Sequence, residues 1–226
     1  MNYLLYMALP MAFGFWAQYR VKSAFKAGSE VPAASGMTGA DVAQKILDYE
    51  GISNVGIEAS HGHMSDHYDP KAKMLRLSPD VFGGRSLAAL GVAAHEVGHA
   101  IQDAKAYKPL VFRNAVVPVA SFGSSAFFYI IIAGAMLNMT GLTLLGIALF
   151  SVVVVFQLIN LPVEFDASAR AKTILFDRGF ITSDERRTVS KVLTAAAMTY
   201  VAATVSAVAT LMYYLVQFGI IGGSRD

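Results

Sequence analysis

The chain has no cysteine among its 226 residues, which excludes a zinc site with cysteine ligands. It is also poor in charge: 15% of its residues are charged, compared with about 25% in an average soluble domain. Its net charge of +2 is too small to indicate a nucleic-acid partner, and it lacks the mixture of aromatic and basic residues typical of RNA or DNA readers. With 55% hydrophobic residues, this composition predicts a membrane protein.

Charged residues are absent from residue 114 to residue 163, a stretch long enough for two membrane crossings. Two apolar segments lie within it and two lie outside it, so that the four predicted transmembrane segments are 3–19, 115–139, 142–161 and a segment within 192–218. The first segment has no basic region before it and no clear cleavage motif, which favours a membrane anchor over a cleaved signal peptide. The other three contain no charged residue, which disfavours a metal or solute transporter.

The basic residues predict how the chain is oriented in the membrane. Eleven Lys and Arg lie in residues 20–113 and six in residues 164–191, whereas the turn between the second and third segments has none. The positive-inside rule therefore places both regions in the cytoplasm and both termini outside.

The most informative motif is His95-Glu96-Val97-Gly98-His99. Ser86 is a suitable helix cap, and the sequence from Leu87 to Asp103 contains no proline, so we expect a helix here. Two histidines four residues apart share one helix face and can reach one metal ion, while Glu96 on the flank can accept a proton from an attacking water. The pattern indicates a zinc hydrolase; the alternative is a buried helix that carries two histidines without function.

A catalytic zinc site usually has three protein ligands, so a third must lie on the same side of the membrane as His95. Two crossings separate residue 113 from residue 164, and an even number returns the chain to that side. Glu164 is the first acidic residue after the hairpin, and we predict that it is the third ligand. The alternative is that Glu164 only stabilises a helix N-terminus electrostatically.

Four segments together resemble the YugP-like neutral zinc metallopeptidases of bacterial membranes, and more distantly the HtpX and Ste24 membrane proteases; these segments are 86–102, 161–168, 65–70 and 73–79. The resemblance implies that His95, His99 and Glu164 bind Zn²⁺, that Glu96 is the catalytic base and that the chain lies in the plasma membrane of a bacterial cell. It also implies a gluzincin-like site, in which an Asp four residues after the ligand Glu often orients a histidine.

That position is Ser168 in this chain, so the partner of each histidine's second ring nitrogen is open. Asp166 is near in sequence, but two residues after Glu164 on a helix it is expected to face the other way. Asp103, four residues after His99, is another candidate.

The capping box Thr38-Gly39-Ala40-Asp41 predicts a helix over 38–50 that stops at Gly51, and residues 52–78 predict a small hairpin or three-strand sheet. A strand at 63–69 or 73–78 is expected to pair with extended substrate backbone. A second capping box, at Thr182 to Glu185, predicts one long helix that runs through the membrane to Phe218.

Three histidines, His61, His63 and His67, would share a face on one strand, which suggests either a second metal site or a histidine-rich surface. His67 or Tyr68 is a candidate donor of a hydrogen bond to the oxyanion of the reaction, and Arg170 is an equal rival.

The predicted fold is mainly α and integral to the membrane, with four transmembrane helices and a cytoplasmic zincin-like region that includes a small sheet. In chain order the parts are a transmembrane helix (1–19), a cytoplasmic region (20–113) with helix 38–50, sheet 52–78 and zinc-binding helix 86–104, a transmembrane hairpin (114–161), cytoplasmic helices with the third ligand (162–191) and a fourth transmembrane helix (192–218).

The leading functional hypothesis is a membrane-embedded, zinc-dependent endopeptidase that hydrolyses polypeptides, such as membrane or juxtamembrane proteins, at the cytoplasmic membrane surface. The alternative is a catalytically inactive membrane scaffold or adaptor whose fold is stabilised by zinc.

Overall fold

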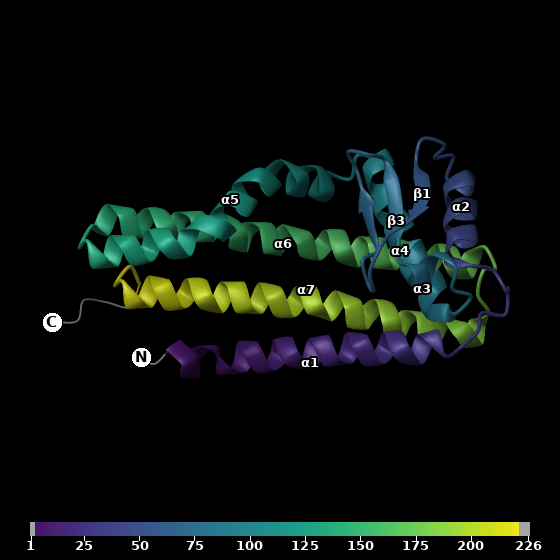
Figure 1. Cartoon of the computed structure of the whole chain (residues 1–226), viewed down its shortest axis with the longest axis horizontal. Coiled ribbons are helices and arrows are strands. Elements are labelled where there is room, and N and C mark those ends of the chain that lie inside the picture. The colour runs from purple at the N-terminus through teal and green to yellow at the C-terminus, as the bar shows by residue number, and fades with distance from the viewer. Residues whose placement is uncertain (1–2, 222–226) are drawn as a thin grey trace.

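A computed structural model of the chain describes residues 3–221. Four long helices form an elongated bundle, and a smaller group of helices surrounds a sheet near one end of it (Figure 1). The elements in chain order are α1 (Tyr3–Ser29), α2 (Gly39–Tyr49), β1 (Gly56–Ala59), β2 (His67–Asp69), β3 (Met74–Leu77), α3 (Pro79–Phe82), α4 (Leu87–Ala104), α5 (Lys108–Met136), α6 (Thr140–Asp177) and α7 (Ser183–Gln217). The predicted mainly helical fold with a small sheet is therefore confirmed.

The starts of three helices follow from local capping chemistry. Thr38 and Asp41 form the predicted capping box at α2, and the side chain of Ser86 accepts a hydrogen bond from a backbone amide of α4. Thr182 and Glu185 form the second capping box, and α7 then continues without a break to Gln217, as its proline-free sequence predicts.

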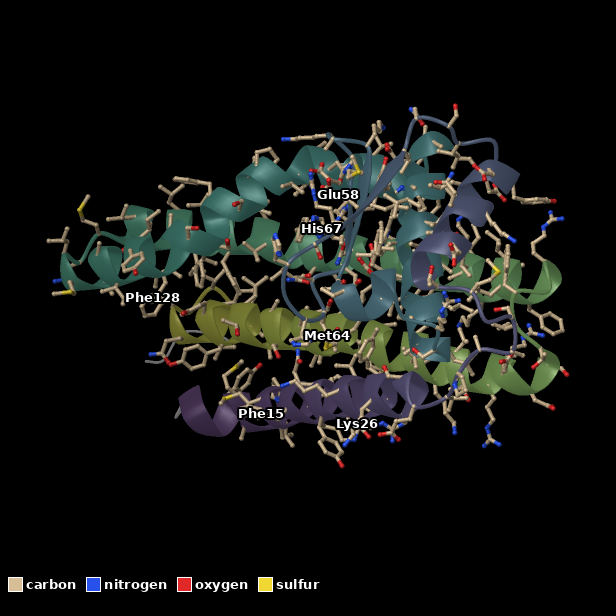
Figure 2. The ribbon with its side chains drawn as sticks, turned by 45° about the vertical axis from the view of Figure 1, so that its right-hand side comes forward. Phe15, Lys26, Glu58, Met64, His67 and Phe128 are labelled. Carbon is tan, nitrogen blue, oxygen red and sulfur yellow. The ribbon has the colours of Figure 1, made fainter. Side chains whose placement is uncertain are left out.

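Three of the described helices, α5, α6 and α7, are long and apolar enough to cross a membrane. Many of their large apolar side chains face outward: Phe122 is 62% exposed and Tyr129 73%. Figure 2 shows Phe128, which is also exposed, on the part of the bundle that lies far from the sheet. The helix α1, where the sequence predicts a fourth span, is not among the three, because Pro10 and the polar residues near its middle dilute its apolar stretch.

The helices α1 and α7 lie antiparallel to each other along most of their length. The rings of Tyr6 and Tyr213 lie 6.0 Å apart near one end of the pair, and Gly28 lies against Val192 near the other. The helices α5 and α6 form an antiparallel hairpin. The start of α1, the end of α7 and the α5–α6 turn all lie at the end of the bundle that is remote from the sheet (Figure 1).

The sheet has the strand order β1-β3-β2, with β1 parallel and β2 antiparallel to β3. Leu75 and Leu77 of β3 are fully buried and pack into the main core. Because β3 pairs on both sides, residues 73–78 cannot accept a further strand, which corrects one of the two predicted substrate-pairing positions. The strand β2, within the other predicted position, lies at an edge of the sheet.

The helix α4 lies at the centre of the core. It contacts α2, the sheet, α6 and α7, and most of its residues are buried. A helix surrounded in this way is apolar on nearly every face, which explains the run of small and aliphatic residues from Leu87 to Ala94. The polar side chains that α4 carries in this setting need specific partners.

Candidate metal centre

The two histidines of α4 face α6 where the two helices touch. A Cβ atom at Gly98 would lie 2.8 Å from the backbone oxygen of Ala167, so only glycine allows this approach of the helices. Glu164 is one turn before Ala167 on α6. The close crossing therefore brings its carboxylate to the face of α4 that carries His95 and His99.

The ligand atoms of His95, His99 and Glu164 lie within 4.8 Å of one another. The Oε2 atom of Glu164 is 3.3 Å from Nε2 of His95 and 3.6 Å from Nε2 of His99. Atoms at the corners of a zinc tetrahedron, each about 2.0 to 2.2 Å from the ion, lie about 3.4 Å apart. The spacing and the chemistry of this donor set fit Zn²⁺.

An unsatisfied buried atom gives a second reason for a metal at this point. The Oε2 atom of Glu164 is buried and has no hydrogen-bond partner, although it faces two imidazoles. Burial raises the pKa of Glu164, but His95 and His99 lower it by more, so the pKa lies below its ordinary value. A buried carboxylate oxygen without a hydrogen-bond partner is costly, and a cation at the shared point would satisfy it.

Both histidines use their second ring nitrogen in a hydrogen bond. The Nδ1 atom of His95 is 3.1 Å from Oγ of Ser168, and Nδ1 of His99 is 3.0 Å from Oε1 of Gln102. The Nε2 atom of Gln102 donates to the carbonyl of Val163 and to the carboxylate of Asp166, each at 2.8 Å. Because its amide nitrogen faces two acceptors, the oxygen of Gln102 must face His99 and accept the Nδ1 proton. This leaves the lone pair of the His99 Nε2 atom directed toward Glu164.

A cleft of about 280 Å³ opens beside these residues. It is lined by His95, Glu96 and Glu164, by residues of α1 and α7 that include Tyr200, and by Met64 and Asp66 of the β1–β2 loop. Figure 2 shows Met64 in this loop, over the helical bundle. Glu96 is 8% exposed and lies where a carboxylate can meet a molecule in the cleft.

Comparison with known proteins agrees with this site. The chain matches the family described as "Putative neutral zinc metallopeptidase" over residues 3–219. The chain belongs to this family. It is 47% identical over 208 residues to the "Putative membrane protease YugP" of Bacillus subtilis (strain 168), with 92% of each chain covered. No solved structure matches.

In this member of the neutral zinc metallopeptidase family, Ser168 is the one predicted partner that contacts a histidine directly, namely His95. Asp166 is reached only through Gln102, and it also accepts a hydrogen bond of 2.6 Å from Nε of Arg170. The expectation that Asp166 faces away from the site is thus corrected in part. Asp103 lies elsewhere: it accepts hydrogen bonds from Tyr68 (2.6 Å) and Lys73 (2.5 Å) and joins α4 to the sheet.

The three candidates for oxyanion contact, His67, Tyr68 and Arg170, are not among the residues that line the cleft. Each of them makes other contacts. The hydroxyl of Tyr68 donates to Asp103, and burial together with this bond raises the pKa of Tyr68. A ring nitrogen of His67 is bonded to the backbone oxygen of Ser65. Arg170 pairs with Asp166 and lies over the ring of Tyr107.

The structure does not bring His61, His63 and His67 to one point. Only His67 belongs to a strand, because a turn with positive φ angles at Gly62 and Met64 separates the three. His63 pairs with Asp80 instead. Within residues 3–221, the His95, His99 and Glu164 group is the one set of such side chains placed to hold a metal.

Gln102 and Tyr200 are site residues that sequence reasoning missed. Gln102 is one turn after His99, so its spacing was a usable signal, but a glutamine on a buried helix has many other uses. Tyr200 lies 104 residues after Glu96 (200 − 96) on an apolar helix, and no local motif marks it.

Proposed function

We propose that this chain is a zinc-dependent endopeptidase that hydrolyses polypeptides at the cytoplasmic surface of a membrane. The observation that carries the proposal is the placement of Glu96 in one cleft with His95 and Glu164, whose ligand atoms converge with that of His99. Membership of the neutral zinc metallopeptidase family and the name of the Bacillus relative support the same activity.

His95, His99 and Glu164 would hold Zn²⁺, which when bound supplies a Lewis acid that polarises the scissile carbonyl. Glu96 accepts a proton from the attacking water while the oxygen of that water bonds to the carbonyl carbon. Glu96 then donates that proton to the leaving amine as the carbon–nitrogen bond breaks. Ser168 and Gln102 hold the two imidazoles in position throughout.

The edge of β2 is the proposed place for substrate backbone. No described strand pairs with its outer side, and the loop immediately before it, with Met64 and Asp66, lines the cleft. An extended polypeptide that pairs with His67–Asp69 would therefore be directed toward Glu96.

The same proposal places four helices in the membrane. The uncharged α5–α6 turn lies outside and the zinc site lies at the cytoplasmic surface. The fourth span is α1, which is only moderately apolar but lies against α7 far into the remote end of the bundle. Its exposed Leu9 (82%) and Phe15 (72%) would contact lipid.

The test compares the purified wild-type protein with Glu96→Gln for cleavage of an unfolded polypeptide. We expect the rate to fall by about 100-fold or more, because proton transfer is lost. Metal analysis is the control, since the variant retains all three ligands and is expected to keep one zinc per chain. Equal rates for the two proteins would exclude the mechanism. One zinc per chain without turnover of any substrate by the wild type would favour the scaffold alternative.

A further inference from the structure

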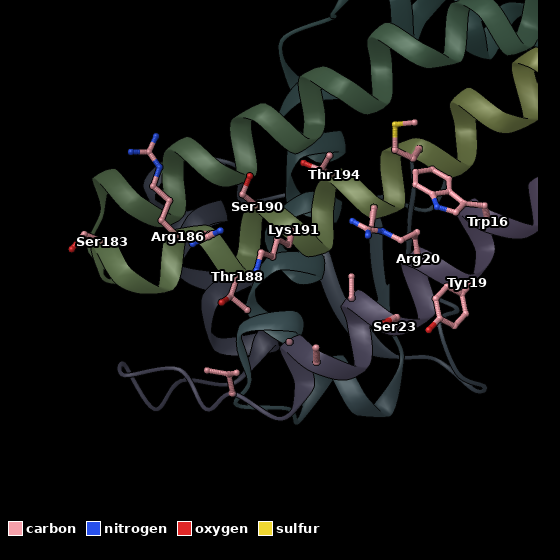
Figure 3. Close-up of a pocket in the computed structure, with 17 residues that line it drawn as sticks. Trp16, Tyr19, Arg20, Ser23, Ser183, Arg186, Thr188, Ser190, Lys191 and Thr194 are labelled. Carbon is pink, nitrogen blue, oxygen red and sulfur yellow. The ribbon is translucent and has the colours of Figure 1, made fainter. Parts of the chain in front are cut away.

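A second and larger cavity, of about 1270 Å³, lies between α1 and α7. At 100° per residue, its α1 residues, such as Arg20 and Ala27, lie on the face opposite Gln18 and Val21, which line the catalytic cleft. The cavity is therefore separate from the metal centre. We name it the α1–α7 groove; Figure 3 shows its lining residues.

The groove is strongly cationic. Its 17 lining residues include Arg20, Arg186, Arg187 and Lys191 but no acidic residue. Arg20 lies over the ring of Trp16 and Arg186 over that of Phe176. Within residues 3–221, none of the four cations has an acidic partner within 4.0 Å. Four positive charges around one cavity without neutralising acids attract an anion.

Hydroxyl groups line the same walls. Ser190 and Thr194 lie one turn apart on α7, and Ser23 lines the groove from α1 (Figure 3). Hydroxyls and cations together are the usual protein partners of phosphate oxygens. The floor is made of small residues: a Cβ atom at Gly28 would lie 2.8 Å from Cγ2 of Val192, so the two helices touch there and leave the space above them open.

The groove changes character along its length. Trp16 and Tyr19 lie at the end toward the predicted spans, whereas Arg186 and Ser183 lie at the other end, which leads away from the predicted spans (Figure 3). Met198 lines the groove farther along α7 than Lys191, toward the predicted spans. Tryptophan and tyrosine favour the membrane interface, where one side of the ring is apolar and the other wet. A free phosphate would need the basic part only, whereas a phospholipid matches both parts.

We propose that the α1–α7 groove binds an anionic phospholipid. Its phosphate lies among Arg20, Arg187 and Lys191, and an acyl chain extends past Trp16 and Met198. The choice of a lipid rests on the membrane placement under Proposed function. The binding itself does not depend on peptidase activity, so failure of one proposal is distinguishable from failure of the other.

The test uses Trp16, which is the single tryptophan of the chain and lies in the groove. The full-length protein is reconstituted in phosphatidylcholine vesicles that contain a minor fraction of phosphatidylglycerol. Bromine atoms, which quench tryptophan fluorescence on contact, are carried on the acyl chains of one lipid or the other. At equal brominated fractions, we expect brominated phosphatidylglycerol to quench Trp16 several-fold more than brominated phosphatidylcholine.

The variant Arg187→Gln/Lys191→Gln removes two groove cations and leaves Arg20 in place beside Trp16. We expect its relative affinity for phosphatidylglycerol to fall about 25-fold, at about fivefold for each cation. The matched control Lys22→Gln/Lys26→Gln removes two exposed charges of α1 that do not line the groove, and it is expected to keep the preference.

Three results would overturn the proposal. Equal quenching by the two lipids would show that the groove does not select a charged headgroup. Equal loss of preference in both double variants would assign the effect to overall charge. Loss of the preference on addition of inorganic phosphate, at constant ionic strength, would identify a site for free anions.

Discussion

Gln102 connects the metal centre to α6 through one side chain. It is fully buried, and its amide is bonded to His99 on one side and to Val163 and Asp166 on the other. The same group thus selects the tautomer of a histidine and ties α4 to the helix that carries Glu164. Arg170, which holds Asp166, is the outermost member of this chain of contacts.

Replacement of Gln102 by leucine, which has a similar size, removes these hydrogen bonds without opening a large cavity. We expect zinc affinity to fall by about 10- to 100-fold, because the His99 ring is no longer held. Competition with a fluorescent chelator on the purified protein measures this affinity. Gln44→Leu, on the exposed face of α2, is the control and is expected to leave it unchanged. Equal zinc affinity in wild type and Gln102→Leu would show that Gln102 does not support metal binding.

At the scale of elements, the contact between α4 and α6 decides whether the ligands meet. Glycine normally weakens a helix by about 1 kcal/mol relative to alanine, yet Gly98 lies in the middle of α4. The short distance to Ala167 is the reason. The separation of the two helix backbones is therefore part of the metal site.

Gly98→Ala is expected to push α4 and α6 apart, at a cost of about 1 to 3 kcal/mol that exceeds the gain in helix propensity. The midpoint of thermal unfolding should fall, and zinc content should fall with it. Gly14→Ala in α1, where a Cβ atom would meet nothing within 4 Å, is the matched control and should not lower either quantity. An unchanged zinc content in Gly98→Ala would contradict this account of the crossing.

Another contact between elements has a defined pH dependence. The carboxylate of Glu185 caps α7 at Thr182 and also accepts a hydrogen bond of 2.6 Å from the amide of Ala34, in the segment between α1 and α2. Burial raises the pKa of Glu185, but these hydrogen bonds lower it by more, so that it lies below its ordinary value of 4.5. A lowered pKa means that the stabilisation is complete above pH 4.5 and is lost as the pH falls below it.

We therefore expect Glu185→Gln to lower the unfolding midpoint by about 2 to 4 °C at pH 7. This difference from the wild type should shrink as the pH falls through 4.5 and below. Comparing the two proteins at each pH cancels any loss of zinc that they share. Asp184→Asn, an exposed acid of the same first turn, controls for the helix dipole. A difference that does not depend on pH would contradict the role of the charge.

At the scale of the whole molecule, the arrangement of the ends is the main result. The α5–α6 turn and the outer ends of α1 and α7 lie together, at the end of the bundle opposite the sheet (Figure 1). The helix α5 runs from the sheet to the remote end and α6 runs back, which agrees with the even number of crossings that we propose between residues 113 and 164.

The absence of cysteine makes this topology easy to test. Gly141→Cys places a thiol in the first turn of α6, where nothing lies within 4 Å, and Ala72→Cys places one in the exposed turn before β3. In intact cells we expect a membrane-impermeant thiol reagent to label the first and not the second. Lysis should make Ala72→Cys reactive, which controls for its accessibility. The opposite labelling pattern would invert the proposed orientation.

Features set by neighbours in sequence could be predicted. The capping boxes at Thr38 and Thr182 and the proline-free run after Ser86 depend on local chemistry, and the structure has helices at all three places. Counting two crossings for the uncharged hairpin returned Glu164 to the side of His95, and the resemblance to the metallopeptidase family favoured it as the third ligand. The contact between Glu164 and His95 could be predicted without knowing how the hairpin packs.

Features set by packing could not be predicted. The pairing of β1 with β3 rather than β2 leaves no mark in the sequence, and a turn around Gly62 separates histidines that a continuous strand would have aligned. The choice of Gln102 over Asp103 depends on the rotation of α4: Gln102 faces α6, whereas Asp103, the next residue, faces the sheet.

The division of the metal ligands between α4 and α6 has a consequence for how the protein is made. A chain that is still being synthesised contains His95 and His99 before Glu164 exists, because the hairpin of α5 and α6 lies between them. In the proposed topology this hairpin has to enter the bilayer before Glu164 can return to the two histidines. Under the proposed topology, a copy that has missed the membrane cannot assemble the three-ligand site. If the proposed function holds, the newly made protein would stay inactive toward soluble cytoplasmic proteins until insertion is complete.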